Sequence, residues 1–407
     1  LGEEKPFTTT FSEMAKRLLG KEFETREEML DRVISKQNQK DFENIAIKSS
    51  FEFLTNLRNF LNHDICNLFV PKTMVFGDIV INEDEMRDIF FNRLKNIAIH
   101  KRIEVLAESI VEKFHIPPSS KDDLLKRAEK LLYDKFITTD LLKIYNLFLR
   151  NSGLEEIEQI GAYDIAPILL IKETMFSLKS NFDAKYVIID EMQDYTPCHF
   201  YLFEKIWSCG KLYLGDVFQS IDRTLTPSYI ENLAKLTKAK VKYLDKSYRS
   251  TKQISVFSQK ILGKHIADNV NRNGEEVEFI KTTNCAKRIE KLLAEREQDS
   301  KDKRQSIAII CKTKEQIQRL QKESAIIKKF KVLRNDSPIS NSKRVITTPA
   351  QAKGVEFDCV IIPFANNKNY KNELDKNLLY VASTRALHKL FFVSDGTPSK
   401  FLMKKSK

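Results

Sequence analysis

Two adjacent carboxylates, Asp190 and Glu191, follow four apolar residues near the middle of the chain, and Gln193 and Asp194 come after one intervening residue, Met192. The apolar run over 186–189 predicts a short strand that is buried on both faces of a parallel sheet. At the carboxyl end of such a strand, one carboxylate can bind Mg²⁺ while its neighbour orients or deprotonates a water that attacks a phosphate. The residues favour this phosphate chemistry, although an ordinary strand followed by a polar turn gives the same string.

Four more segments place polar or charged side chains after predicted strands or along a predicted helix. Gly215 permits a tight exit from a strand, and the neutral amide of Gln219 behind it can sense a phosphate or a water. The remaining candidates are Tyr248, Arg249, Gly354, Glu356 and Arg385. Taken singly, each of these residues also suits a surface charge, a salt-bridge partner or a core aromatic.

The elements that must position these residues alternate between strands and helices from residue 156 onward, which is typical of an α/β fold with parallel sheets and crossover helices. Strands are predicted over 186–189, 211–214, 241–244, 306–311, 344–348, 358–363 and 389–394. Helices are predicted over 252–262, 285–296 and 313–323. We expect the first three strands to share one sheet and the later four to form a second.

The preceding part of the chain, residues 23–155, has a mostly helical pattern. Apolar residues recur at helical spacing over 103–114 and 124–136, and Ser120 is expected to cap the second of these helices. A brief β-like stretch near 74–81 interrupts the pattern. These apolar stripes predict the core of a helix bundle.

Composition narrows the class of protein. The 407 residues suffice for two or three domains, and the net charge of +12 favours a polyanionic partner such as nucleic acid, although lysine also serves solubility. The chain has no run of 18 apolar residues, so we expect no membrane partner. Six dispersed cysteines with no metal-site spacing indicate a reducing cytoplasm, without disulfides or structural zinc.

Taken in order, the five segments resemble motifs II to VI of the UvrD/Rep-type superfamily 1 helicases, over about residues 156–395. The resemblance implies an α/β fold with two RecA-like domains and ATP in the cleft between them. The implied boundaries are a lead-in to the first RecA-like domain (1–22), a mainly helical 1B-like insertion (23–155), the rest of the first domain (156–246) and the second domain (247–407).

The same resemblance implies ATP and Mg²⁺ as cofactors and gives the candidate catalytic residues roles. Asp190 would bind Mg²⁺, and Glu191 would activate the hydrolytic water. Gln219 would report the γ-phosphate. Arg249 and Arg385 match the two family arginines, whose planar and permanently charged groups stabilise charge in phosphoryl transfer.

Three further residues fall where the family binds the nucleotide. Glu356 would contact the ribose, with Gly354 beside it, and Tyr248 would pack near the nucleotide unless it is a core aromatic. The phosphate cradle itself, Gly-x4-Gly-Lys-Ser/Thr, does not occur in the sequence. We therefore expect that the chain starts downstream of this loop, and that the polypeptide alone binds ATP weakly and does not hydrolyse it.

Departures from the family cluster on the nucleic-acid side. Asp222 and Thr224 stand where relatives carry stacking aromatics, and Asp222 would repel a phosphate backbone. Ala350 replaces the usual histidine of motif V. The segment from Arg249 to Thr347 also leaves no room for a large 2B insertion. This combination resembles the HelD branch, helicase-like ATPases that associate with bacterial RNA polymerase.

Three hypotheses follow. The first is an ATP-driven, cytoplasmic and monomeric remodelling factor, with nucleic acid (DNA in particular) and the RNA polymerase core as partners. The second is a conventional 3'-5' DNA helicase of repair or replication. The third is a non-enzymatic binding module whose nucleotide site has degenerated, against which the intact set of acidic, amide and arginine residues argues.

Overall fold

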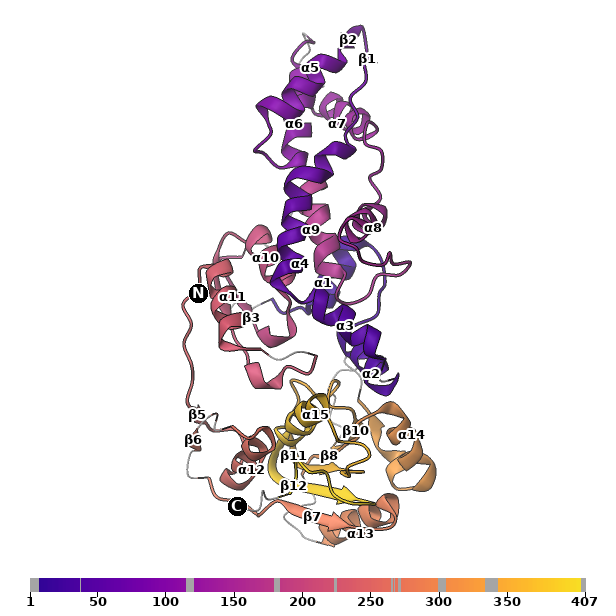
Figure 1. The fold of residues 1–407 in the computed structure, drawn as a ribbon, viewed down its shortest axis with the longest axis vertical. Helices are drawn as coiled ribbons and strands as arrows, with labels where there is room; N and C mark the ends of the chain where they lie inside the picture. The colour runs from indigo at the N-terminus through magenta and orange to yellow at the C-terminus, as the bar shows by residue number, and fades with distance from the viewer. Residues whose placement is uncertain are drawn as a thin grey trace. The chain divides into compact units, whose positions relative to one another are not determined.

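The computed structural model describes residues 7–36, 38–114, 121–178, 184–222, 225–264, 266, 268–269, 272–298, 305–333 and 343–403. The chain forms two compact units, with the elements labelled in Figure 1. Unit 1 comprises residues 1–25, 45–188 and 195–212. Unit 2 comprises 26–44, 189–194 and 213–407. The chain therefore passes between the units several times, and the predicted site residues all belong to unit 2.

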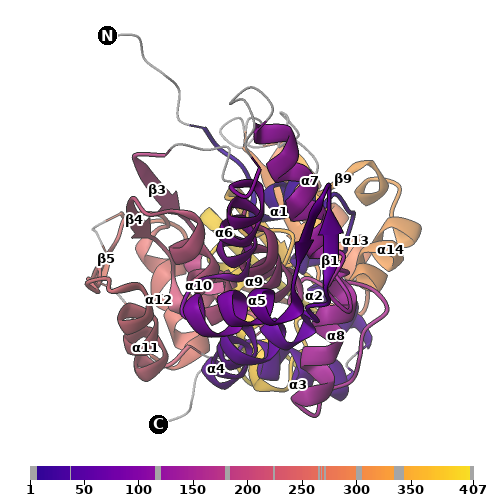
Figure 2. The ribbon, with the colours of Figure 1, turned by 90° about the horizontal axis from the view of Figure 1, so that it is seen from above.

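Unit 1 is a helical assembly. Its helices are α1 (Phe11–Leu19), α4 (Phe51–Asn59), α5 (Glu83–Arg87), α6 (Ile99–Val111), α7 (Lys121–Tyr133), α8 (Leu141–Asn151), α9 (Ile165–Phe176) and α10 (Pro197–Ile206). Helix α9 is apolar around most of its circumference and is buried from Ile165 to Ile171, as expected for a central helix. Helices α1, α6, α8 and α10 all contact it (Figures 1 and 2). Of the apolar stripes predicted to form the bundle core, Ile103, Leu106, Ile110, Ala128 and Leu132 are buried as expected, whereas Leu131 is 37% exposed.

The β-like stretch near 74–81 is an antiparallel hairpin of β1 (Met74–Phe76) and β2 (Ile79–Ile81). The predicted helices over 103–114 and 124–136 correspond to α6 and α7, each of which begins a few residues earlier. The predicted cap, Ser120, lies outside the described residues. Within the described part of the chain, no helix combines the length and apolar character needed to cross a membrane.

Unit 2 contains a six-stranded sheet in the order β7-β12-β11-β8-β10-β9, in which every pairing is parallel. The strands are β7 (Glu278–Lys281), β8 (Ile307–Ile310), β9 (Lys331–Val332), β10 (Arg344–Thr347), β11 (Phe357–Ile362) and β12 (Ala386–Ser394). The four central strands are the predicted ones. This sheet confirms the α/β class.

Helices cover both faces of this sheet. Helices α13 (Cys285–Gln298) and α14 (Lys314–Glu323) pack on one face, where Ile307 and Ile309 point. Helices α2 (Arg26–Lys36), α12 (Lys252–Leu262) and α15 (Glu373–Ser383) share a core with Ala308 and Ile310 on the other. Two covered faces explain why β8 is apolar at every position. Helix α11 (Pro227–Thr237) also belongs to unit 2, and α3 (Gln39–Lys48) spans the boundary.

Two predictions for the first sheet are wrong. Strand β3 (Tyr186–Ile189) is not buried on both faces, because Tyr186 and Ile188 are 60% and 64% exposed. It pairs with β4 (Gly210–Tyr213) in a sheet of only two strands, which leaves these side chains uncovered.

Residues 241–244 form no strand, and Leu244 is 90% exposed. Only the following β5 (Lys246–Ser247) pairs, with β6 (Asp268–Asn269). An apolar run with β propensity forms a strand only where an adjacent strand is present to hydrogen-bond with its backbone N–H and C=O groups.

Candidate functional site

Asp190 and Glu191 lie where β3 ends, just before a short 3-10 turn, Met192–Asp194. Glu191 has a φ of +50°, in the left-handed region that non-glycine residues seldom adopt and that often marks functional sites. Its backbone N–H donates to Asp190 Oδ1 at 2.8 Å. The Gln193 amide donates to Glu191 Oε2, so a neutral side chain orients this carboxylate.

Gln193 also joins the two strand ends. Its side chain is fully buried, and its Oε1 accepts a hydrogen bond from the backbone N–H of Asp216, 3.1 Å away. A Cβ at Gly215 would lie 2.2 Å from that oxygen and 2.6 Å from Met192 Cγ. A side chain at position 215 would therefore collide with Gln193 and Met192. The sequence predicted glycine here for a tight turn, and the structure adds this close packing as the reason.

Gln219 is held by the start of its own turn. Asp216 caps the short helix Val217–Gln219 by accepting from Phe218 N at 2.9 Å. The other oxygen of Asp216 accepts from Gln219 Nε2, also at 2.9 Å. This arrangement leaves Gln219 Oε1 turned toward other partners.

Arg385 is the hydrogen-bond partner of Gln219 Oε1. It follows α15, whose start is fixed by a capping box of Asn372 and Asp375. The guanidinium is 1% exposed, donates to Val381 O at 3.2 Å through Nε and donates to Gln219 Oε1 through Nη2. Two residues predicted from separate motifs are thus in direct contact.

Charges around Arg385 come from every segment of the predicted site. Burial lowers the pKa of its guanidinium, and the nearby Arg249 lowers it further. The carboxylates of Glu191, Glu356 and Asp216 raise it. Even so, an arginine remains charged in a protein.

Arg249 and Glu356 are paired with each other, with Nε 2.5 Å from Oε1. Both side chains are partly exposed. Gly354, two residues before Glu356, has a φ of +74° that favours glycine. Tyr248 is 68% exposed, so the alternative of a core aromatic is wrong.

Comparison with known proteins bears on the second half of this site. A family model, the UvrD-like helicase C-terminal domain, matches residues 344–393. The crystal structure of the C-terminal domain of a possible DNA helicase from Lactobacillus plantarum WCFS1 is 32% identical, and the match covers 39% of this chain and 94% of that chain, with a TM-score of 0.33. The family match supports a relationship of this part of the chain to UvrD-type helicases. The residues that the family model matches include Gly354, Glu356 and Arg385.

Another similar structure is that of the arterivirus nonstructural protein 10 helicase in complex with DNA. It is 11% identical to the chain, the match covers 53% of this chain and 41% of that chain, and the TM-score is 0.27. A search of curated proteins gives no match.

The structure reveals an ionic network that sequence reasoning missed. The side chain of Lys353 is 6% exposed and pairs with Asp194, the last acid of motif II. Burial lowers the pKa of Lys353, and the charge of Asp194 raises it in opposition. Arg26, at the start of α2, lies 3.2 Å from Asp194 and 2.7 Å from Asp222. Lys353 lies in the segment of Gly354 and Glu356, whereas no local pattern marks Arg26.

This network changes the interpretation of the altered strand-contact positions. The Asp222 side chain is fully buried in its ion pair with Arg26, so its charge is neutralised locally rather than presented to a phosphate backbone. Ala350 is buried as well, at 1% exposure. Thr224 lies outside the described residues.

Asp190 is the candidate Mg²⁺ ligand. Its carboxylate is exposed at the strand end, and it offers the hard oxygen atoms that Mg²⁺ prefers. No group of three or more His, Cys, Asp or Glu side chains in the described ranges could hold a metal. The residues present fit a Mg²⁺ ion that is held by one or two carboxylates and otherwise by water and phosphate.

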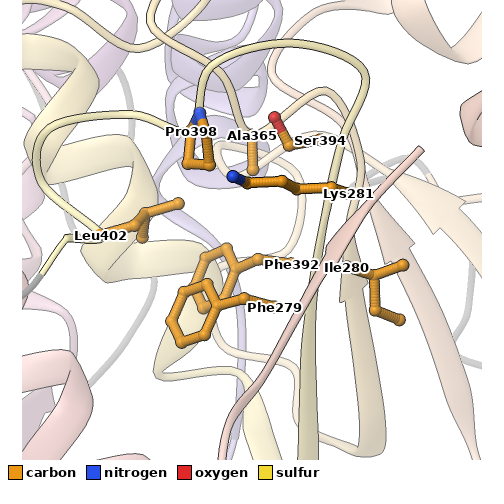
Figure 3. A pocket seen from close by; sticks show the side chains of 8 residues that line it. All are labelled: Phe279, Ile280, Lys281, Ala365, Phe392, Ser394, Pro398 and Leu402. Atoms are coloured by element: carbon orange, nitrogen blue, oxygen red, sulfur yellow. The ribbon is translucent and has the colours of Figure 1, made fainter. Parts of the chain in front are cut away.

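A pocket of about 310 Å³ lies elsewhere in unit 2, beside β7 and β12. The stacked rings of Phe279 and Phe392, with centroids 5.3 Å apart, line it together with Lys281 and Leu402 (Figure 3). None of the predicted site residues lines this pocket.

Proposed function

We propose that the chain is part of an ATP-dependent superfamily 1 motor, with Asp190 as the Mg²⁺ ligand and Glu191 as the residue that activates the attacking water. The observation that carries this proposal is the contact of Arg385 with Gln219, close to the charge of Glu191. Three segments far apart in the sequence thereby bring a base, a polar sensor and a guanidinium together.

The residues of the candidate site have distinct roles in the proposed phosphoryl transfer. Gln193 holds one oxygen of Glu191, which directs the other toward a water. Gln219 reports the γ-phosphate because its amide is shared between Asp216 and Arg385. Arg385 and Arg249 stabilise the charge that develops on the transferred group.

The nucleotide-contact roles are part of the same proposal. Glu356 contacts the ribose, Gly354 allows the backbone to approach, and Tyr248 offers an exposed ring for packing on the nucleotide. Because the Walker A pattern does not occur in these 407 residues, we propose that this polypeptide alone binds ATP weakly and does not turn it over.

We propose two RecA-like domains, with residues 156–246 in the first and 247–407 in the second, and 23–155 as an insertion. The parallel sheet of unit 2, covered by helices on both faces, supports the second of these domains. In the full-length parent protein, ATP binds between them.

For the motor's task we favour remodelling of a nucleic-acid complex with RNA polymerase over processive unwinding. The burial of Asp222 in an ion pair, where relatives carry a stacking aromatic, supports this choice. Co-purification of the full-length protein with RNA polymerase, and an ATPase rate that is indifferent to single-stranded DNA, would agree with it.

The alternative is a DNA helicase, which is favoured by the net charge of +12 and by the similarity to a possible DNA helicase. Unwinding of a forked DNA by the full-length protein would establish the alternative and refute the remodelling task. The test of the shared ATPase mechanism is Glu191→Gln, which should retain nucleotide binding and lose hydrolysis.

A further inference from the structure

Three hydrogen-bond donors meet at one edge of the unit 2 sheet. Strands β8 and β10 are parallel neighbours, with Ile310 opposite Thr347. Their carboxyl ends therefore lie side by side, at the edge where α/β sheets bind ligands. Lys314 follows β8 at the start of α14, and Thr348 and Gln351 follow β10.

All three donors point at a single carboxylate, that of Asp31 on α2. Thr348 Oγ1 donates to Asp31 Oδ1 at 2.7 Å. Gln351 Nε2 donates to Asp31 Oδ2 at 3.2 Å. Lys314 Nζ lies 3.3 Å from the same oxygen. One cation and two neutral donors from two loops are the ingredients of an anion-binding site.

Asp31 is an unusual occupant for the core of a protein. Its side chain is 2% exposed, and burial raises its pKa although the three donors act in the opposite direction. Lys314, by contrast, is half exposed, at 51% of its side chain. The cationic donor therefore lies at the surface, whereas Thr348 and Gln351 are 1% and 5% exposed and lie beneath it with Asp31.

Helix α2 is also docked by apolar contacts. Leu30 and Ile34, on either side of Asp31, are buried in the core that includes Ile310, Ala350 and Ala352. The helix can leave this edge only when a competing ligand compensates for exposing both side chains. Helix α2 is therefore held at this edge both by buried apolar side chains and by the Asp31 carboxylate.

We propose that Asp31 is an internal anion that occupies a phosphate-binding site formed by Lys314, Thr348 and Gln351, so that α2 holds this edge of the sheet closed to a nucleic-acid strand. The identity of the ligand rests on the proposed function. The site itself rests only on the three donors and their shared carboxylate. Removal of Asp31 frees the donors for a phosphodiester group of the strand.

The experiment compares Asp31→Ala with Asp41→Ala in this chain. Asp41 is a matched control because it also lies in 26–44, pairs with Arg32 at 3.6 Å and changes the net charge equally. The first probe is inorganic phosphate, read as a shift of the thermal unfolding midpoint. The second is a fluorescent single-stranded oligonucleotide, read by anisotropy.

The proposal predicts that phosphate raises the unfolding midpoint of Asp31→Ala but not of Asp41→Ala, and that Asp31→Ala binds the oligonucleotide at least about fivefold more tightly than the control, equivalent to about 1 kcal/mol. Adding Thr348→Val should remove both gains. If Asp31→Ala fails to fold, Asp31→Ser, whose shorter side chain leaves the donors without the carboxylate, is compared with Asp41→Ser in the same way.

Equal responses of Asp31 and Asp41 variants to both probes would overturn the proposal and make Asp31 a purely structural contact. A phosphate effect without tighter oligonucleotide binding would also overturn it, because the ligand would not be a nucleic-acid strand. Neither probe measures hydrolysis, so failure here is distinct from failure of the Glu191 mechanism.

Discussion

The guanidinium of Arg385 donates a hydrogen bond to the side-chain oxygen of Gln219, in an environment where Arg385 is 1% exposed and Gln219 is 6% exposed. The two residues are 166 positions apart in the sequence. Because Gln219 also donates to Asp216, a single side-chain amide links Asp216 to Arg385.

Arg385→Ala should reduce ATP turnover by the full-length protein by about 1,000-fold or more, with a much smaller loss of nucleotide binding. The reason is that the charge acts on the transition state. Steady-state kinetics and a nucleotide titration measure the two effects. An equal loss of turnover and binding would indicate a ground-state clamp instead.

Glu191→Gln should nearly abolish hydrolysis while preserving affinity, because the residue loses its basicity with little change of shape. Glu204→Gln is a suitable control, since Glu204 pairs with Lys211 at 3.0 Å in unit 1. Single-turnover hydrolysis distinguishes the two variants. Residual turnover comparable to that of the control would make the assignment of Glu191 wrong.

Arg26→Met should lower the free energy of unfolding by about 3–5 kcal/mol, because it leaves the buried carboxylate of Asp222 without its cation. Replacing both partners, in Arg26→Met with Asp222→Leu, should recover much of this loss. Urea denaturation measures both variants. A double variant no more stable than Arg26→Met would contradict the importance of this pair.

The pH dependence of stability should report on Asp31. Burial raises its pKa above the ordinary value of 3.8. Its stabilising contribution is therefore fully present below 3.8 and is lost as the pH rises through the folded-state pKa. The free energy of unfolding of the wild type should fall, relative to that of Asp31→Asn, as the pH rises above about 4. A difference that stays constant as the pH rises would contradict a raised pKa.

Gly215→Ala should destabilise unit 2, because the new methyl group would lie 2.2 Å from Gln193 Oε1. The expected cost is about 1–3 kcal/mol, as for other overpacked positions. Thermal unfolding measures it, with Gly263→Ala as a contrast. A Cβ at Gly263 meets nothing within 4 Å, so that variant bears only the cost of its φ of +70°.

The sequence predicted the parts of the fold in which burial is visible in a local pattern. Strand β8 is apolar at every position because helices cover both faces, and its run was recognised for that reason. The edge strand β7 was missed because Glu278 and Lys281 break its apolar run. Residues 241–244 have the same pattern as a strand but find no neighbour among the described residues.

For the candidate site, residues in sequence motifs were predicted, whereas residues that act only through long-range contacts were not. Residues with a fixed place in a motif, such as Gln219 and Arg385, were predicted and lie together in the structure, although their catalytic roles are still to be tested. Arg26 and Asp31 could not be predicted, because their partners Asp222 and Thr348 lie almost 200 and more than 300 positions away. Such contacts depend on tertiary packing and leave no local signal.

ATP hydrolysis by the full-length protein tests the central claim most directly when Glu191→Gln and Arg385→Ala are measured singly and together. Residues that act on one triphosphate should be strongly non-additive, so the double variant should hydrolyse ATP little more slowly than Glu191→Gln alone. Wild-type turnover by Arg385→Ala, or losses that simply multiply, would contradict a shared site.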